Sequence, residues 1–170
     1  GGNRTMFHVG EGVIHPGHGG CVVDDVGVRP WKEASDTFYM LRPIMDENLK
    51  VFVPIDGAEN IGIRKAISAA EATEIIEGFS SLTYEWQPDF KKRRETCSLI
   101  LRGNDIFALS KMVKAYMCLS DKSHSSSTDN ELYAASKKKF ISELALALGE
   151  NAETVEKAMY ARISPQKNAV

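Results

Sequence analysis

The chain has 170 residues, 43% of them apolar and 26% charged, with a formal net charge of −2. This composition is typical of a folded, water-soluble protein, and the length suits one ordinary domain or two small ones. No apolar run approaches the roughly 18 residues of a membrane span, and the first twenty residues lack a secretory pattern. We therefore expect a cytoplasmic protein without membrane contact, in which residues 1–5 are a leader outside the fold.

The charge is unevenly distributed along the chain. Residues 1–63 contain five basic and nine acidic side chains, whereas residues 64–170 contain sixteen basic and fourteen acidic ones. The first part is therefore acidic and the second slightly basic, an asymmetry that ordinary surface scatter also explains.

The first third of the chain has the pattern of β-strands. Apolar residues on both sides of the segment HPGHGG, residues 15–20, predict a tight hairpin, because Pro16 fixes φ and the glycines tolerate positive φ. Residues 37–44 and 49–55 predict two more strands joined by the turn MDEN, and Pro54 closes the last one. Four or five short strands within about 50 residues favour an SH3-like or Tudor-like antiparallel barrel, which closes its sheet to hide the edges.

After Arg64 the periodicity becomes helical, and start and stop signals divide it into five helices. The signals are a capping box of Ser68 and Glu71, Gly78 as a stop, Pro88 at a first helical position, Gly103 as a stop, Asn104 as a cap, a second capping box of Thr128 and Glu131, Gly149 as a stop, and Asn151 as a cap. The predicted fold class is α+β: a β-barrel domain at residues 6–62, followed by an all-α five-helix bundle at residues 63–170.

The spacing His15-x₂-His18-x₂-Cys21 has the residue types of a metal site. A closed zinc site needs four ligands, and no second pair with similar spacing exists, so we interpret these residues as polar turn residues and predict no metal or cofactor. A metal-dependent hydrolase using these three residues is the weakest of our hypotheses. Cys97 and Cys118 lie in apolar helical patterns and are expected in the core, and no nucleotide-binding or hydrolase motif is present. The sequence predicts no enzyme.

A basic segment lies beside a tryptophan at residues 84–94, YEWQPDFKKRR. Four consecutive cations cannot all face a core, so at least Lys91, Lys92 and Arg94 are expected in solvent. With Arg93 and with Lys111 and Lys114 of the following helix, they form a candidate phosphate-binding surface. Trp86 precedes the helix in a loop, and an apolar ring beside cations is typical of a wedge at an unstacked base step. The alternatives are a solvated helix face for the cations and a staple packed on its own helix for Trp86.

The chain resembles the CarD/CdnL family of bacterial transcription regulators from Met6 to about Met159. The shared motifs are F-x-V-G-x-x-V-x-x-P-x-H-G from Phe7 to Gly19, Tyr39-x-Leu41, V-x-V-P from Val51 to Pro54, E-N-I-G-I-R from Glu59 to Arg64 as the joint between two domains, Trp86, and I-S-E-L-A from Ile141 to Ala145. The resemblance implies a non-enzymatic, monomeric partner of bacterial RNA polymerase. Its barrel binds the polymerase β subunit, while its helical domain lies on promoter DNA upstream of the melted region. There the tryptophan wedges the minor groove and stabilises the open complex.

The implied contact residues carry over position by position. The polymerase-binding positions are Arg29, Lys50, Val51, Phe52 and Val53, and the DNA-binding positions are Trp86, Lys91, Lys92, Arg93, Arg94, Lys111 and Lys114. Two departures stand out: Phe52 occupies a position where actinobacterial relatives have an arginine, and Pro88 and Asp89 replace an arginine pair. The main alternative is a polymerase-binding module whose helical domain docks another protein without touching DNA. The matching barrel of transcription-repair coupling factor supports this alternative, although the chain has none of that factor's helicase motifs.

Overall fold

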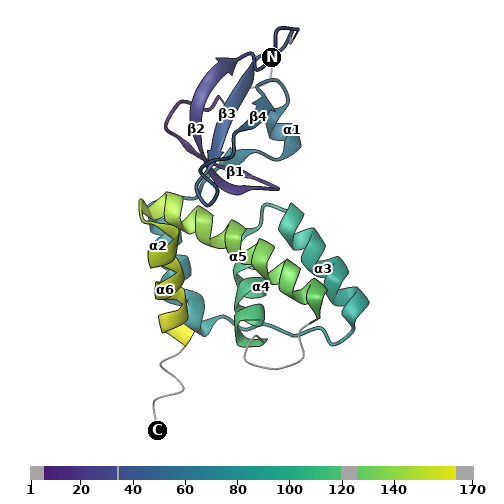
Figure 1. The fold of residues 1–170 in the computed structure, drawn as a ribbon. Helices are drawn as coiled ribbons and strands as arrows, with labels where there is room; N and C mark the ends of the chain where they lie inside the picture. The colour runs from purple at the N-terminus through teal and green to yellow at the C-terminus, as the bar shows by residue number, and fades with distance from the viewer. Residues whose placement is uncertain (1–5, 34, 120–125, 164–170) are drawn as a thin grey trace. The chain divides into compact units, whose positions relative to one another are not determined.

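A computed structural model describes residues 6–33, 35–119 and 126–163, so the expected leader at residues 1–5 lies outside the described residues (Figure 1). The chain forms two compact units that divide between Ala66 and Ile67. The first unit is a sheet with one short helix, and the second is entirely helical. This confirms the predicted α+β class with a β domain followed by an all-α domain.

The first unit contains a five-stranded antiparallel sheet in the order β4-β3-β2-β1-β5. Its strands are β1 (Gly12–His15), β2 (Gly19–Val28), β3 (Phe38–Pro43), β4 (Val51–Pro54) and β5 (Arg64–Lys65). Among the described residues β4 and β5 do not pair, so the sheet is open and the prediction of a closed barrel is wrong. Strand β5 has only two residues, and both pair with β1, so β5 and β4 remain separate edges of the sheet.

The predicted hairpin is present, and its strands pair from Gly12 with Val22 to His15 with Gly19. One face of the sheet carries the core, in which Tyr39, Leu41 and Val53 pack with Val13 and Val23. The Tyr39 hydroxyl accepts a hydrogen bond from the Phe7 backbone N–H at 3.2 Å, which fixes the chain entering the sheet.

The short helix α1 (Ala58–Ile61) was not predicted and leads directly into β5. It ends at Gly62, where φ is +105°, and a Cβ atom at this position would lie 2.9 Å from Cγ of Pro16. Glycine is therefore required both by the backbone conformation and by the hairpin turn packed against it. The motif expected to join the two domains thus lies inside the first unit.

The helical unit contains the five predicted helices and one additional 3₁₀ turn. They are α2 (Ala69–Gly78), the 3₁₀ turn η1 (Phe79–Ser81), α3 (Phe90–Arg102), α4 (Ile106–Leu119), α5 (Ser127–Leu148) and α6 (Ala152–Ile163). The long helix α5 packs against all four other α-helices of its unit (Figure 1). Its buried residues Phe140, Ile141 and Leu144 form the centre of this core.

The helix boundaries confirm some predicted caps and correct others. The Ser68–Glu71 capping box, the left-handed Gly149 and the Asn151 cap are present. Three helices instead begin at neighbouring residues whose side-chain oxygens accept backbone N–H bonds in the first turn. In α3 the cap is Asp89 and the first helical residue is Phe90 rather than Pro88; the caps are Asp105 rather than Asn104 in α4 and Ser126 rather than Thr128 in α5.

Candidate functional site

Trp86 lies in the extended segment between η1 and α3, half-buried against α4. Its indole meets the Tyr116 ring edge-on, with ring centroids 5.5 Å apart and an interplanar angle of 88°. The guanidinium carbon of Arg93 lies 4.5 Å from the indole centroid, a distance typical of a cation–π contact. One part of the Trp86 ring is therefore packed against Tyr116 and Arg93, and the remainder is accessible.

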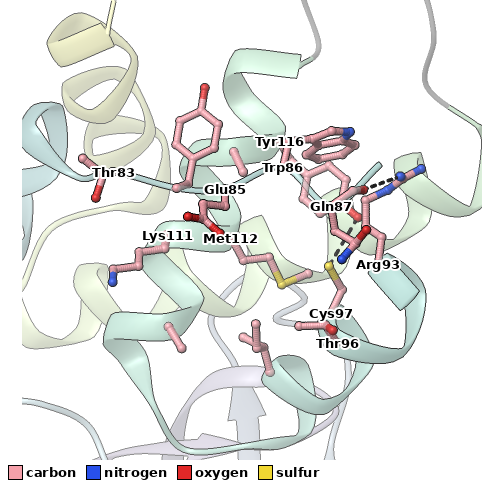
Figure 2. A pocket seen from close by; sticks show the side chains of 14 residues that line it. Thr83, Glu85, Trp86, Gln87, Arg93, Thr96, Cys97, Lys111, Met112 and Tyr116 are labelled. Atoms are coloured by element: carbon pink, nitrogen blue, oxygen red, sulfur yellow. Dashed lines mark hydrogen bonds between the residues drawn. The ribbon is translucent and has the colours of Figure 1, made fainter. Parts of the chain in front are cut away.

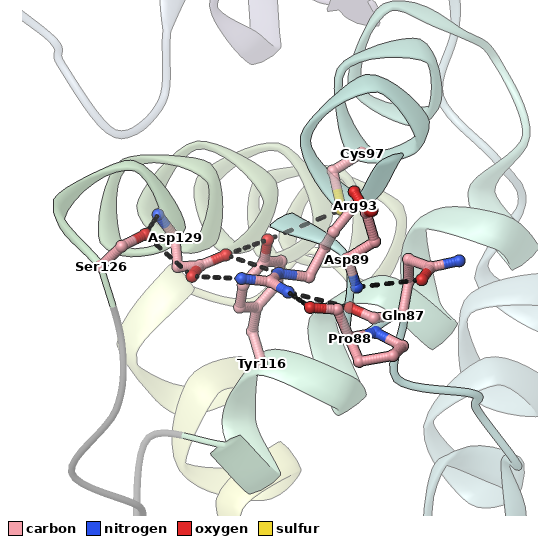
Figure 3. Close-up of polar contacts among 8 residues, drawn as sticks. All are labelled: Gln87, Pro88, Asp89, Arg93, Cys97, Tyr116, Ser126 and Asp129. Atoms are coloured by element: carbon pink, nitrogen blue, oxygen red, sulfur yellow. Dashed lines mark hydrogen bonds and ion pairs between the residues drawn. The ribbon is translucent and has the colours of Figure 1, made fainter. Parts of the chain in front are cut away.

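Arg93 forms a bidentate ion pair with Asp129 of α5 (Figure 3). Its Nε donates to Oδ1 at 3.0 Å and its Nη2 to Oδ2 at 2.9 Å, while Nη1 donates to the Gln87 carbonyl at 2.8 Å. The two side chains are only 11% and 3% exposed. Arg93 thus fastens the segment following Trp86 to α5, and the expectation that it belongs to an exposed phosphate-binding surface is corrected.

The surroundings of Asp129 favour its charged form. The ion pair with Arg93 lowers the pKa of the Asp129 carboxyl, and bonds from Ser126 at the start of α5 lower it further. The Tyr116 hydroxyl also donates to Asp129 Oδ1 at 3.2 Å, and burial raises the pKa of Tyr116 above its ordinary value. Trp86 therefore rests on a network in which each buried polar group has a partner.

A pocket of about 490 Å³ opens beside Trp86 (Figure 2). It lies between the segment 83–87 and helices α3 and α4, and is lined by Thr83, Tyr84, Glu85, Trp86, Gln87, Arg93, Thr96, Cys97, Ile100, Ala108, Lys111, Met112, Ala115 and Tyr116. Burial raises the pKa of the Cys97 thiol, which lies 3.6 Å from the Tyr116 hydroxyl. A thiol kept protonated in this way is a packing residue rather than a nucleophile, as the sequence predicted.

The remaining cations of α3 face solvent, as predicted for Lys91, Lys92 and Arg94. Lys91 and Arg94 line a shallow groove together with Glu95, Ser98, Leu99 and Arg102. Lys111 is exposed on α4, where its ammonium lies 5.1 Å from the centroid of the exposed Phe107 ring. Exposed cations of the helical unit thus lie on α3 and in the first turns of α4, and further exposed cations, Lys157 and Arg162, lie on α6.

Lys114, by contrast, points into the unit. It is 8% exposed, and its Nζ donates to the carbonyls of Ser80 and Leu82 at 2.6 and 2.8 Å. These carbonyls lie at the end of η1, where a buried cation satisfies acceptors that the helix leaves unpaired. The expectation that Lys114 lies on the same exposed surface as Lys111 is therefore corrected.

Four of the candidate polymerase-binding residues, Lys50 to Val53, lie in or next to the edge strand β4, whereas Arg29 follows the central strand β2. Arg29, Lys50 and Phe52 are exposed and Val51 is half-buried, whereas Val53 is only 2% exposed and belongs to the core. Val53 pairs with the buried Tyr39 and supports the strand from beneath. The Val53 side chain is therefore not an exposed contact, although its backbone still belongs to the edge strand.

Two apolar residues near Phe52, Met40 and Trp31, were not recognised from the sequence as part of this surface. Phe52 pairs with Met40 of β3, and Trp31, which is 54% exposed, packs on Phe38 of the same strand with ring centroids 5.2 Å apart. Because residues 38 and 40 alternate with the buried Tyr39 and Leu41, they face away from the core. This period-two alternation was the available signal for a second apolar face of the sheet.

The His15 side chain forms hydrogen bonds to the backbone of the hairpin turn. His15 Nδ1 accepts the N–H groups of Gly17 and His18 at 2.9 and 3.2 Å, and the two imidazole rings lie 4.7 Å apart. Within the described part of the chain, no group of three or more His, Cys, Asp or Glu side chains is arranged to hold a metal ion. His15, His18 and Cys21 are thus accounted for by the hairpin.

Two protein-family models match the chain and together span both units. The CarD-like/TRCF RID domain matches residues 7–67, and the CarD C-terminal domain matches residues 65–160. Their junction at residues 65–67 coincides with the division between the two compact units. Among the helices that the structure describes, none is long and apolar enough to cross a membrane.

Proposed function

The chain belongs to the CarD-like family of RNA polymerase-interacting transcription regulators, and we propose that it stabilises the open promoter complex of bacterial RNA polymerase. In this proposal the sheet unit binds the polymerase β subunit, and the helical unit contacts promoter DNA at the upstream edge of the melted region. The protein acts in the cytoplasm as a monomer and catalyses no reaction itself.

The β4 edge supports the polymerase half of the proposal. Among the described residues β4 pairs on one side only, with β3, so its other side presents backbone donors and acceptors to a strand of the partner. The adjoining apolar side chains Phe52, Met40 and Trp31 supply contact area, Lys50 supplies positive charge beside the edge, and Arg29 supplies positive charge after the central strand β2. We infer a contact formed by strand addition and bordered by apolar and electrostatic interactions.

The held position of Trp86 is the observation that carries the DNA half of the proposal. Its ring is fixed by Tyr116 and Arg93, so little side-chain entropy is lost when it contacts a base. Inserting a ring between stacked bases costs a few kcal/mol in intact duplex and less where the strands have separated. The ring therefore favours the open complex over the closed one, and this difference in affinity shifts the equilibrium.

The exposed cations of α3 and Lys111 of α4 supply a contact that does not depend on sequence. Lys91, Lys92, Arg94 and Lys111 are placed to meet phosphates, which position a protein on DNA and carry little base information. Arg93 and Lys114 take no part in this contact, because their charges are used inside the unit.

A mobility-shift experiment on forked and fully paired promoter DNA, with and without polymerase, tests the proposal. We expect the protein to strengthen the polymerase complex on forked DNA much more than on paired DNA, and Trp86→Ala to remove this preference. If the protein binds polymerase but changes neither complex, its helical unit docks another protein instead. The exposed Phe90, Leu99 and Phe107 are among the apolar residues of the described helical unit available for that role.

A further inference from the structure

The pocket beside Trp86 has the dimensions of a small-ligand site. Its volume of about 490 Å³ lies within the range of roughly 300–1,000 Å³ that such sites occupy. Three aromatic side chains, Tyr84, Trp86 and Tyr116, line it together with the apolar side chains of Met112 and Ile100. A flat, apolar ring is thus the kind of group that this lining accommodates.

The aromatic end of the pocket carries little net charge. The charge of Arg93 is neutralised by Asp129, and burial keeps the Cys97 thiol and the Tyr116 hydroxyl protonated by raising the pKa of each. A phosphate at this end would therefore have no unpaired cation to bind, whereas an uncharged ring would have a small desolvation cost.

The cations lie instead at the border of the pocket. Figure 2 shows Lys111 at the end away from Trp86 and Arg93, with Glu85 between them. Lys92 is one helical turn before Thr96, which also lines the pocket, so these two side chains are neighbours on α3. The Glu85 carboxylate disfavours a phosphate within the pocket, while Lys111 and Lys92 favour one at its mouth.

We propose that this pocket receives one unstacked nucleobase from the separated DNA strands, with the adjoining backbone phosphate at Lys111. Trp86 then acts twice: as a wedge at the edge of the paired DNA and as a wall of the base pocket. An unpaired base at a melted edge enters at lower cost than one extruded from intact duplex. The inference rests on the proposed function and names the group that the site takes.

The test replaces one base at a time by an abasic site in the unpaired part of a forked promoter fragment. The measured quantity is the stabilisation factor, the ratio of polymerase–fork dissociation rates without and with the full-length protein. At one position we expect the abasic site to lower this factor by on the order of tenfold, the effect of removing one base stacked on an aromatic side chain. Normalising to polymerase alone removes the effect of the abasic site on the enzyme.

Ala108→Leu fills the pocket from α4 with a residue that suits a helix, and Ala135→Leu, at an exposed position of α5 outside the pocket, is the matched control. In Ala108→Leu the intact base no longer enters, so the same abasic site should change the factor less than twofold. In Ala135→Leu the full reduction should remain. If Ala108→Leu unfolds, Thr96→Leu at the exposed border of the pocket replaces it.

Equal reductions in wild type and pocket-filled variant, or no sensitive position at all, overturn the base pocket while leaving the proposed function intact. If wild-type protein fails to stabilise even the unmodified fork, the proposed function itself fails.

Discussion

Arg93 directs its guanidinium inward although its three basic neighbours on α3 face solvent. The helical repeat explains this, because residues 93 and 97 lie on one face while residues 91 and 94 point away from it. Asp129, at the third position of α5, provides a carboxylate with both oxygens aligned to the guanidinium. Arg93 therefore holds Trp86 in place instead of contacting phosphate.

Asp129→Asn tests the importance of this ion pair for the helical unit. The substitution preserves size but leaves the Arg93 guanidinium largely buried without a counter-charge. Removing one partner of a buried pair costs roughly 3–5 kcal/mol. We expect a decrease in unfolding free energy of this order in urea titration, together with a change in Trp86 fluorescence measured in a Trp31→Phe background. A decrease below about 1 kcal/mol would mean that the pair contributes as little as a surface salt bridge.

The same pair gives the stability a definite dependence on pH. Because Arg93 lowers the pKa of Asp129 in the folded state, the charged carboxylate stabilises the fold fully above the ordinary aspartate pKa of about 4. This contribution disappears as pH falls through the lowered pKa. Wild type should therefore lose stability below about pH 4 more steeply than Asp129→Asn. Parallel acid-unfolding curves for the two proteins would contradict this assignment.

At the scale of single elements, α3 divides its charges between interior and surface. Lys91, Lys92 and Arg94 changed together to glutamine should reduce the salt dependence of promoter-complex binding, with the slope falling by about 0.9 for each phosphate that the variant no longer neutralises. Lys157→Gln, at an exposed lysine of α6, is the control and should leave the slope unchanged. An unchanged slope in the triple variant would mean that α3 presents only a solvated helix face.

The proposed role of the edge strand β4 leads to a separate prediction about polymerase binding. Phe52→Asp places a charge in the apolar face beside the edge and should weaken polymerase binding at least tenfold, as expected for a central contact residue. Val9→Asp, at a more exposed apolar position of the same unit, is the control. Binding measured by biolayer interferometry should distinguish them, and equal affinities would place the contact elsewhere on the unit.

Local sequence signals predicted most elements of the fold. The hairpin, the strands at β3 and β4, and the Ser68–Glu71 box follow from turn chemistry and capping, which act within a few residues. Helix α1 and strand β5, with four and two residues, are too short to show a period. Sheet closure depends on pairing between distant strands, and neither composition nor periodicity records it.

The candidate site was predictable only in part for a related reason. The sequence indicated which side chains α3 must expose, but not that Asp129, 36 residues further on, would meet Arg93. Likewise, the burial of Lys114 depends on the carbonyls of η1, a short turn without a clear sequence signal. Partners from distant elements thus decide which cations remain available to DNA.

At the scale of the whole molecule, the two units have separate cores and separate proposed partners. A fragment of residues 1–66 should fold and retain polymerase binding in a pull-down, since it contains the complete sheet with β5. The complementary fragment, residues 67–170, should not bind polymerase by itself. Polymerase binding found only in the helical fragment would reverse the proposed roles of the two units.

The lifetime of the open complex with Trp86→Ala tests the central claim most directly. The measurement is made with polymerase saturated by protein, using Phe107→Ala as an exposed aromatic control, with a thermal melt of each variant. Because Trp86 is half-buried against Tyr116 and Arg93, we expect a decrease in stability of about 1–2 kcal/mol, within the usual range for a single substitution. We also expect a lifetime reduced toward that of polymerase alone, with partial recovery in Trp86→Phe. A strongly lowered melting temperature together with a wild-type lifetime would contradict the account and make Trp86 a purely structural residue.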